Sequence, residues 1–172
     1  MILKGTNIVL GVTGGIAAYK AVELCSRLVQ AGASVDVIMT PAATHFVTPL
    51  SFQTLTVHPV SVDQFQLLRD MDMAHIELSK KAQVLVIAPA TANTMAKIAV
   101  GLADNLLTST ALATTAPLVI APAMDADAGP AEWRTCLPAS GQGSSAGRLE
   151  CSRATSAGDL RRTVRAWVLI GV

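Results

Sequence analysis

The chain has 172 residues, enough for one domain, and its formal net charge of +1 argues against a nucleic-acid-binding protein. Hydrophobic residues make up 51% of the chain and charged residues 15%, a composition that excludes intrinsic disorder and favours a buried interface between subunits. Aromatic residues contribute only 3%, so the core must be built from Ala, Val, Leu and Ile, as is typical of α/β proteins.

The N-terminal part of the chain predicts a βαβ unit. A buried strand over 7–12 is broken by a glycine-containing turn at 13–15, and a helix with apolar residues on one side follows over 16–30. Gly32 is typical of a helix stop, and a second buried strand is predicted over 34–39. Because such crossovers are right-handed, we expect the two strands to lie parallel in one sheet.

Helices and strands continue to alternate along the next part of the chain. The predicted elements are a helix over 42–56 interrupted near 48–49, a short helix over 75–81, a strand over 83–88, a loop over 89–94, a helix over 95–112 with Gly101 as a weak point, and a strand over 117–121. This alternation predicts an α/β fold with a parallel sheet. We expect a single domain over 1–172, with a mobile loop over 126–160 and a closing strand or helix over 161–172.

The cysteines and the N-terminal residues indicate the cellular compartment of the protein. Cys25, Cys136 and Cys151 are odd in number and irregular in spacing, which predicts neither a disulfide framework nor a metal site. The first apolar run is short and is interrupted by Gly11, so we expect no signal peptide and no membrane span. The sequence therefore predicts a cytoplasmic protein without a metal.

Small and polar residues follow the predicted strands, where open parallel sheets bind ligands. Gly14 and Gly15 would let a ligand approach backbone N–H groups, although a tight strand–helix turn explains them equally well. Thr40 and Thr91 each offer a hydroxyl, and Asn93 offers a donor and an acceptor suited to the edge of a heteroaromatic ring. Each of these three residues also fits a helix N-cap. The convergence of such groups predicts a ligand site more strongly than any single motif.

Three motifs carry a resemblance to a known family. They are Gly14-Gly15-Ile16-Ala17-Ala18-Tyr19-Lys20, Pro89-Ala90-Thr91-Ala92-Asn93-Thr94 and Ala121-Pro122-Ala123-Met124. Over about residues 4–125 the chain resembles the homo-oligomeric flavin-containing cysteine decarboxylases, which include phosphopantothenoylcysteine decarboxylase and the peptidyl-cysteine decarboxylases. The resemblance implies FMN as cofactor, a flavodoxin-like, Rossmann-type three-layer sandwich, and assembly as a homotrimer or dodecamer.

The resemblance also implies roles for individual residues. Those that match the family's FMN contacts are Gly14, Gly15, Ile16, Thr40, Pro41, Ala42, Thr91, Ala92, Asn93, Thr94 and Ala123. His75, in Ala74-His75-Ile76-Glu77-Leu78, matches the catalytic histidine and would accept a proton from the thiol side of the substrate. Histidine suits this role because imidazole titrates near neutral pH. His45 and His58 match no family motif and are expected to be exposed or to pack.

The sequence departs from the family around the substrate site. The family normally continues Pro-Ala-Met-Asn-x-x-Met-Trp, whereas here Met124 is followed by Asp125 and the Met-Trp pair is absent. The asparagine normally binds the substrate carboxylate, which an ionised Asp125 would repel at a cost of roughly 1–4 kcal/mol. Met124 and Asp125 are the expected substrate-binding residues, with recognition altered or activity impaired. Cys151 matches the proton-donating cysteine of the family's flap, but the glycine pattern that normally follows it is missing.

These features predict a stand-alone FMN enzyme that oxidatively decarboxylates a terminal cysteine to an enethiol. The altered substrate residues favour the C-terminal cysteine of a ribosomally made peptide, slightly ahead of 4′-phosphopantothenoylcysteine in coenzyme A biosynthesis. The alternative from another functional class is a non-catalytic regulatory subunit that binds flavin. It is motivated by Asp125 and by the missing glycine pattern of the flap, both of which would impair catalysis. A flavin prenyltransferase is a weaker alternative, since basic residues for a prenyl phosphate are not evident.

Overall fold

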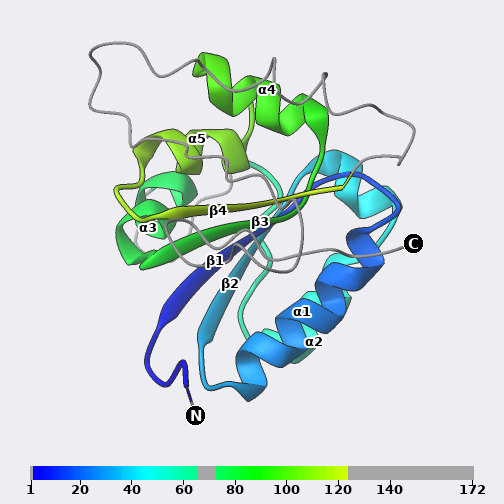
Figure 1. The fold of residues 1–172 in the computed structure, drawn as a ribbon, viewed down its shortest axis with the longest axis vertical. Helices are drawn as coiled ribbons and strands as arrows, with labels where there is room; N and C mark the ends of the chain where they lie inside the picture. The colour runs from blue at the N-terminus through cyan, green and yellow to red at the C-terminus, as the bar shows by residue number, and fades with distance from the viewer. Residues whose placement is uncertain (1, 66–72, 124–172) are drawn as a thin grey trace, which may run out of the picture.

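The computed structural model describes residues 2–65 and 73–123, which are built around one β-sheet (Figure 1). Its strands are β1 (Asn7–Val12), β2 (Ser34–Met39), β3 (Val84–Ala90) and β4 (Leu118–Pro122). All pairings between these strands are parallel, and the strand order is β2-β1-β3-β4. The predicted parallel sheet is therefore confirmed.

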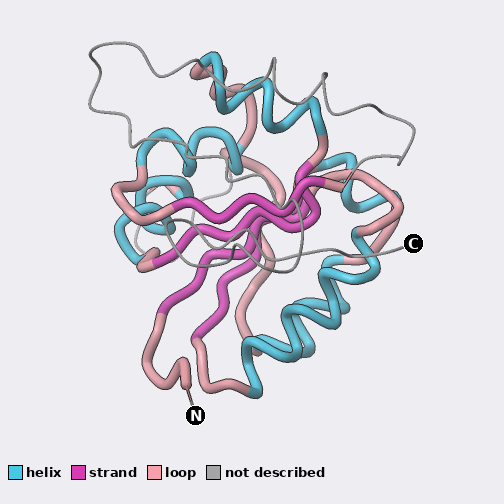
Figure 2. The backbone as a smooth tube through the Cα atoms, in the orientation of Figure 1, coloured by secondary structure: helices cyan, strands magenta, loops and turns pink. Residues whose placement is uncertain are grey.

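Helices cover both faces of the sheet. They are α1 (Ala18–Gln30), α2 (Pro49–Thr56), α3 (Ala74–Lys81), α4 (Ala92–Val100) and α5 (Leu106–Ala113), together with the short 3₁₀ helix η1 (Pro41–His45). Helices α1 and α2 pack together on one face, whereas α3, α4 and α5 lie on the other, and Figure 2 shows the strands between these layers. The predicted three-layer α/β sandwich is confirmed.

The alternation of side chains along β1 lets one strand serve two cores. Ile8 and Leu10 are buried beneath α1 and α2, whereas Val9 belongs to the apolar cluster that α3 and α5 cover. At Gly11, an added β-carbon would lie only 2.4 Å from Cδ1 of Leu107 on α5. Helix α5 can therefore pack closely on β1 because this position has no side chain.

One predicted helix is divided in the structure. The sequence predicts a single helix over 95–112, but α4 ends at Val100, with Gly101 as its C-cap, and α5 begins after Asn105. Gly101 adopts the left-handed conformation, with a φ of 73°, and its N–H donates back into the last turn of α4. Asn105 then starts α5 through a reciprocal capping box with Thr108. A glycine stop followed by an asparagine cap explains the break.

The end of β3 also differs from prediction. The sequence predicts a loop over 89–94, whereas β3 continues to Ala90 and α4 begins at Ala92. Ala90 pairs with Pro122 after an irregularity in the β3–β4 register, and Thr91 caps the first turn of α4. The connection between strand and helix is thus the single residue Thr91, which fixes the start of α4 closely against the end of β3.

The remaining boundaries lie near their predicted positions. The interruption predicted near 48–49 is confirmed, because η1 and α2 are separate elements, and α1 begins at Ala18 rather than at residue 16. The loop predicted over 126–160 and the closing element predicted over 161–172 lie outside the described residues. In the part of the chain that the structure describes, no helix combines the length and apolar character needed to cross a membrane.

Candidate functional site

The carboxyl ends of β1 and β3 form the switch point of the sheet. Strand β1 leads through α1 to β2 on one side, whereas β3 leads through α4 and α5 to β4 on the other. Connections that diverge in this way leave a crevice at the carboxyl edge of an open parallel sheet, where ligands bind. The turns at 13–15 and 91–94, both predicted to carry ligand groups, border this switch point.

Thr13 joins these two turns, although the sequence did not mark it as a site residue. Only 1% of Thr13 is exposed. Its hydroxyl donates to the Pro89 carbonyl at 2.6 Å and accepts from the Thr91 N–H at 3.0 Å. The one local feature that could have indicated a role for Thr13 is its position at a strand end, directly before two glycines. Its partners are 76 and 78 residues away along the chain, which no local pattern encodes.

The turn after β2 also packs against the turn after β1. The Thr40 N–H donates to the Val12 carbonyl at 3.0 Å, and the Thr40 hydroxyl accepts from the Ala43 N–H at 3.3 Å. A β-carbon at Gly14 would lie 2.4 Å from Cβ of Ala42 and 2.8 Å from its carbonyl carbon. Thr40 therefore caps η1, as one of its predicted alternatives, and Gly14 permits the two turns to touch.

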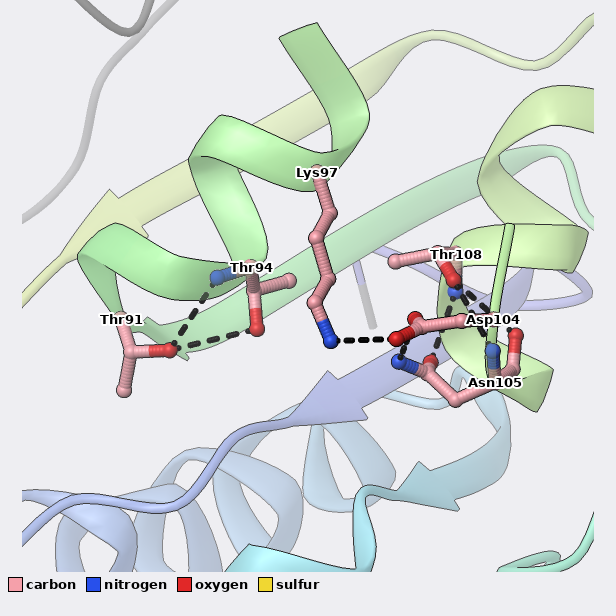
Figure 3. Close-up of polar contacts among 6 residues, drawn as sticks. All are labelled: Thr91, Thr94, Lys97, Asp104, Asn105 and Thr108. Atoms are coloured by element: carbon pink, nitrogen blue, oxygen red, sulfur yellow. Dashed lines mark hydrogen bonds and ion pairs between the residues drawn. The ribbon is translucent and has the colours of Figure 1, made fainter. Parts of the chain in front are cut away.

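The turns after β3 and β4 complete the junction. The Ala123 N–H donates to the Ala90 carbonyl at 3.1 Å. The Thr91 hydroxyl accepts from the Thr94 N–H at 3.4 Å and donates to the Thr94 hydroxyl at 3.2 Å, as Figure 3 shows. Thr91, not Asn93, is thus the cap of α4. Hydrogen bonds thus connect the carboxyl ends of β1, β2, β3 and β4 at this edge.

The residues predicted to bind FMN divide by exposure into supporting and accessible members. The buried members are Thr40 and Thr94. The half-buried members are Gly14, Gly15, Thr91 and Ala123, and the exposed members are Ile16, Pro41, Ala42, Ala92 and Asn93. The structure therefore brings the predicted cofactor residues to one edge, but only part of the set presents atoms to solvent.

Backbone donors and open space make this edge suitable for a phosphorylated flavin. The N–H groups of Ala92 and Asn93, in the first turn of α4, have no acceptor within the helix and suit an anion. A β-carbon at Gly15 would approach nothing more closely than Thr91 Cγ2, at 3.7 Å, so no atom of the chain closely covers this backbone. None of the predicted cofactor residues is acidic. These residues fit a ligand that carries a phosphate.

An ion pair holds α4 to the segment that precedes α5. Lys97 Nζ lies 2.6 Å from Oδ2 of Asp104, and Figure 3 shows the lysine reaching from α4 toward that carboxylate. The hydrogen bond from Lys97 lowers the pKa of Asp104 below its usual value. Because Asp104 is exposed, we assign this pair a role in orienting α4 rather than a large contribution to stability.

His75 lies on a different element from the joined turns. It is half-buried in the first turn of α3, a helix that leads into β3. The chain leaves the opposite end of α3 near the start of the sheet, where the Gln83 N–H donates to the Asn7 carbonyl at 2.9 Å. Within the described ranges, the His75 side chain makes no hydrogen bond or ion pair. No described residue therefore competes for its ring nitrogens.

A buried carboxylate fixes the other end of α3. Asp36 on β2 places Oδ2 2.6 Å from Nζ of Lys81, and Oδ1 3.0 Å from Nδ1 of His58. The Lys81 contact is an ion pair without hydrogen-bond geometry. His58, for which no functional role was predicted, also lies 3.1 Å from the Val35 carbonyl. The cluster therefore anchors α3, the helix that carries His75, to the sheet.

Asp36→Asn is expected to lower the free energy of unfolding by about 1–2 kcal/mol. The value is well below that of a fully buried ion pair because the side chains of Lys81 and His58 are 36% and 35% exposed and can be hydrated. Urea denaturation measures the change. The control is Glu23→Gln, which disrupts the exposed pair with Arg27 and is expected to cost at most about 0.5 kcal/mol. Equal effects of the two variants would contradict the anchoring role.

Among the cysteines, the structure describes Cys25. It is buried in α1, and burial raises the pKa of its thiol to about 11, so it stays protonated and unreactive. Cys151, predicted to be catalytic, lies outside the described residues, as do Met124 and Asp125, predicted to bind substrate. Among the described residues no group of three or more histidine, cysteine or acidic side chains could hold a metal ion.

A family model matches most of the chain. Residues 2–130, more than half of the chain, match the model of the family described as Flavoprotein. This chain belongs to the flavoprotein family. The resemblance carried by the three sequence motifs is thereby confirmed, and flavin is the cofactor for which the family is named.

Similar proteins place this flavoprotein among the cysteine decarboxylases. The coenzyme A biosynthesis bifunctional protein CoaBC of Bacillus subtilis is 51% identical over 123 residues, which cover 72% of this chain and 30% of that protein. The solved structure of the FMN-dependent cysteine decarboxylase SpaF has a TM-score of 0.69 at 35% identity and covers 76% of each chain. A PPC decarboxylase variant complexed with pantothenoylaminoethenethiol has a TM-score of 0.62 at 36% identity, over 75% of this chain and 70% of that one.

These similarities have two consequences for this flavoprotein. Its fold is flavodoxin-like as expected, since solved cysteine decarboxylases superpose on most of the chain. It spans about 30% of the length of the coenzyme A biosynthesis protein that it matches.

Proposed function

We propose that this flavoprotein binds FMN at the joined strand ends and uses it to decarboxylate a substrate that ends in a cysteine. The observation that carries the proposal is the junction of turns at the switch point, where Thr13 holds the start of α4 beside the Gly14–Gly15 turn. The N–H groups of Ala92 and Asn93 would bind the phosphate, and the space beside Gly15 would admit the ligand.

The proposed chemistry follows from the need to stabilise an electron pair. Bound FMN supplies a two-electron acceptor for the hydride of the cysteine β-carbon. Direct loss of CO2 would leave an unstabilised carbanion on the α-carbon. When the β-carbon loses a hydride and the sulfur loses a proton, the side chain becomes a thioaldehyde. Its C=S bond accepts the electron pair as the bond to CO2 breaks, and the product is an enethiolate.

His75 is the residue that we assign to the thiol proton. It is half-buried and makes no hydrogen bond or ion pair within the described residues, so its ring nitrogen can act as an acceptor. Backbone groups at the strand ends orient the cofactor, but they cannot act as a base for the thiol proton. The two tasks, holding the ligand and moving the proton, thus fall to separate parts of the chain.

The apolar surface of the chain supports an assembly of several copies. Large apolar side chains are exposed at the starts of α1 and α2. These are Ile16 (73%), Tyr19 (58%), Phe46 (50%) and Leu50 (69%). Burial of such residues favours association, which supports the predicted homotrimer or dodecamer. Light scattering is expected to give the mass of a trimer or a multiple of it, and a monomer would contradict this assembly.

For the substrate, we place 4′-phosphopantothenoylcysteine first and a peptide C-terminal cysteine second. The sequence alone favours the peptide because Asp125 replaces the expected asparagine, but Asp125 lies outside the described residues. The identity of 51% to a coenzyme A biosynthesis protein, against 35% to the cysteine decarboxylase SpaF, supports the smaller substrate.

Incubation of the purified protein with each substrate tests the proposal. We expect the absorption spectrum of oxidised flavin, and a product from phosphopantothenoylcysteine that is lighter by CO2, with or without two hydrogens. Turnover of the peptide alone would reverse the order of the two substrates. Bound flavin with no turnover of either would favour the non-catalytic regulatory subunit, and failure to take up FMN would contradict the whole proposal.

A further inference from the structure

Thr13 occupies an unusual position for a buried threonine. Its hydroxyl uses both its proton and an oxygen lone pair on backbone groups of another strand end, the Pro89 carbonyl at 2.6 Å and the Thr91 N–H at 3.0 Å. By contrast, the buried hydroxyl of Thr110 donates to the Leu106 carbonyl one turn earlier in its own helix. The Thr110 contact is local, whereas the Thr13 contacts hold two distant turns in register.

The bond from Thr91 determines where α4 begins. Thr91 is the N-cap of this helix, and its N–H is taken by Thr13, so the first turn of α4 is tied to the end of β1. The next residues along the chain from Thr13 are Gly14 and Gly15. The Thr13 N–H also donates to the Pro89 carbonyl, at 3.3 Å, but only the hydroxyl reaches Thr91 at the start of α4. The hydroxyl thus contributes the contact that sets the N–H groups of Ala92 and Asn93 beside the Gly14–Gly15 backbone.

We propose that Thr13 is a positioning residue for FMN, its hydroxyl holding the start of α4 beside the Gly14–Gly15 turn so that both contact one ligand. This inference rests on the proposed function. Thr13 itself is 1% exposed and therefore acts through the turns rather than by touching the cofactor. Loss of the hydroxyl leaves the Thr91 N–H without its partner and frees α4 to shift relative to β1.

The test compares Thr13→Val, Thr13→Ser and Thr110→Val with the wild-type protein. Valine keeps the shape of threonine and removes the hydroxyl, whereas serine keeps the hydroxyl. Thr110→Val removes an equally buried hydroxyl whose hydrogen bond lies within α5. FMN is titrated into each apoprotein, and flavin fluorescence, visible circular dichroism and far-ultraviolet circular dichroism are recorded.

The dissociation constant for FMN is expected to rise about tenfold in Thr13→Val, with an altered visible dichroism of bound flavin. It is expected to stay near the wild-type value in Thr13→Ser and Thr110→Val. Should Thr13→Val fail to fold, Thr13→Cys replaces it, because the thiol is similar in size and a weak donor. That variant is expected to bind FMN more weakly than Thr13→Ser.

Two negative outcomes are distinguishable. Wild-type affinity and dichroism in a folded Thr13→Val, or equal affinity of Thr13→Cys and Thr13→Ser, would overturn the role of Thr13 and leave the proposed function standing. Equal weakening by Thr110→Val would also overturn it, since the effect would then reflect general loss of stability. A wild-type protein that binds no FMN would overturn both.

Discussion

Replacing His75 with asparagine is expected to lower kcat by about 10²–10⁴-fold, the usual contribution of a general base, while FMN stays bound. Asparagine is similar in size to histidine, but its amide cannot take the thiol proton. His75 is half-buried and makes no hydrogen bond or ion pair among the described residues, so its loss should leave the fold unchanged. Mass spectrometry of the product gives kcat, and the visible spectrum gives the FMN content.

The matched control for this variant is His45→Asn. His45 is exposed at the end of η1 and has no motif that connects it with catalysis. The control is expected to retain wild-type kcat and wild-type FMN content. Equal kcat values in the two variants would remove His75 from the mechanism. Loss of FMN from His75→Asn would instead indicate that the histidine supports the cofactor.

Replacing Gly14 with alanine is expected to destabilise the protein by about 1–3 kcal/mol and to weaken FMN binding. The new methyl carbon would lie 2.4 Å from Cβ of Ala42 and 2.8 Å from its carbonyl carbon. Both atoms belong to a short side chain or to backbone, so the contact can be relieved only by separating the turns after β1 and β2. Urea denaturation of the apoprotein and titration with FMN measure the two effects.

Gly15→Ala is the control that separates packing from ligand binding. Its methyl would meet Thr91 Cγ2 at 3.7 Å, an ordinary contact, so apoprotein stability should change by less than about 0.5 kcal/mol. The dissociation constant for FMN should nevertheless rise about tenfold, because the methyl enters the space that the ligand needs. Wild-type affinity in this variant would exclude a ligand beside Gly15. Wild-type stability of Gly14→Ala would contradict the close packing of the turns.

Local patterns predicted most elements of the sheet and its helices. The apolar runs at 7–12 and 34–39 coincide with β1 and β2, because a buried strand leaves its mark on consecutive residues. The division of α4 from α5 was indicated only as a weak point at Gly101. Whether a glycine interrupts a helix depends on the residues after it, and here Asn105 and Thr108 supply a new start.

Local patterns were enough to find the turns and caps after the strands, because glycines, threonines and small residues mark them through their neighbours. Which turns meet depends on how the strands are ordered in the sheet. Thr13 and Thr91 are 78 residues apart, and they touch because β1 and β3 are adjacent in the sheet. The packed fold also places α3, which carries His75, against α5, since a helix's place on the sheet depends on packing that no local motif records.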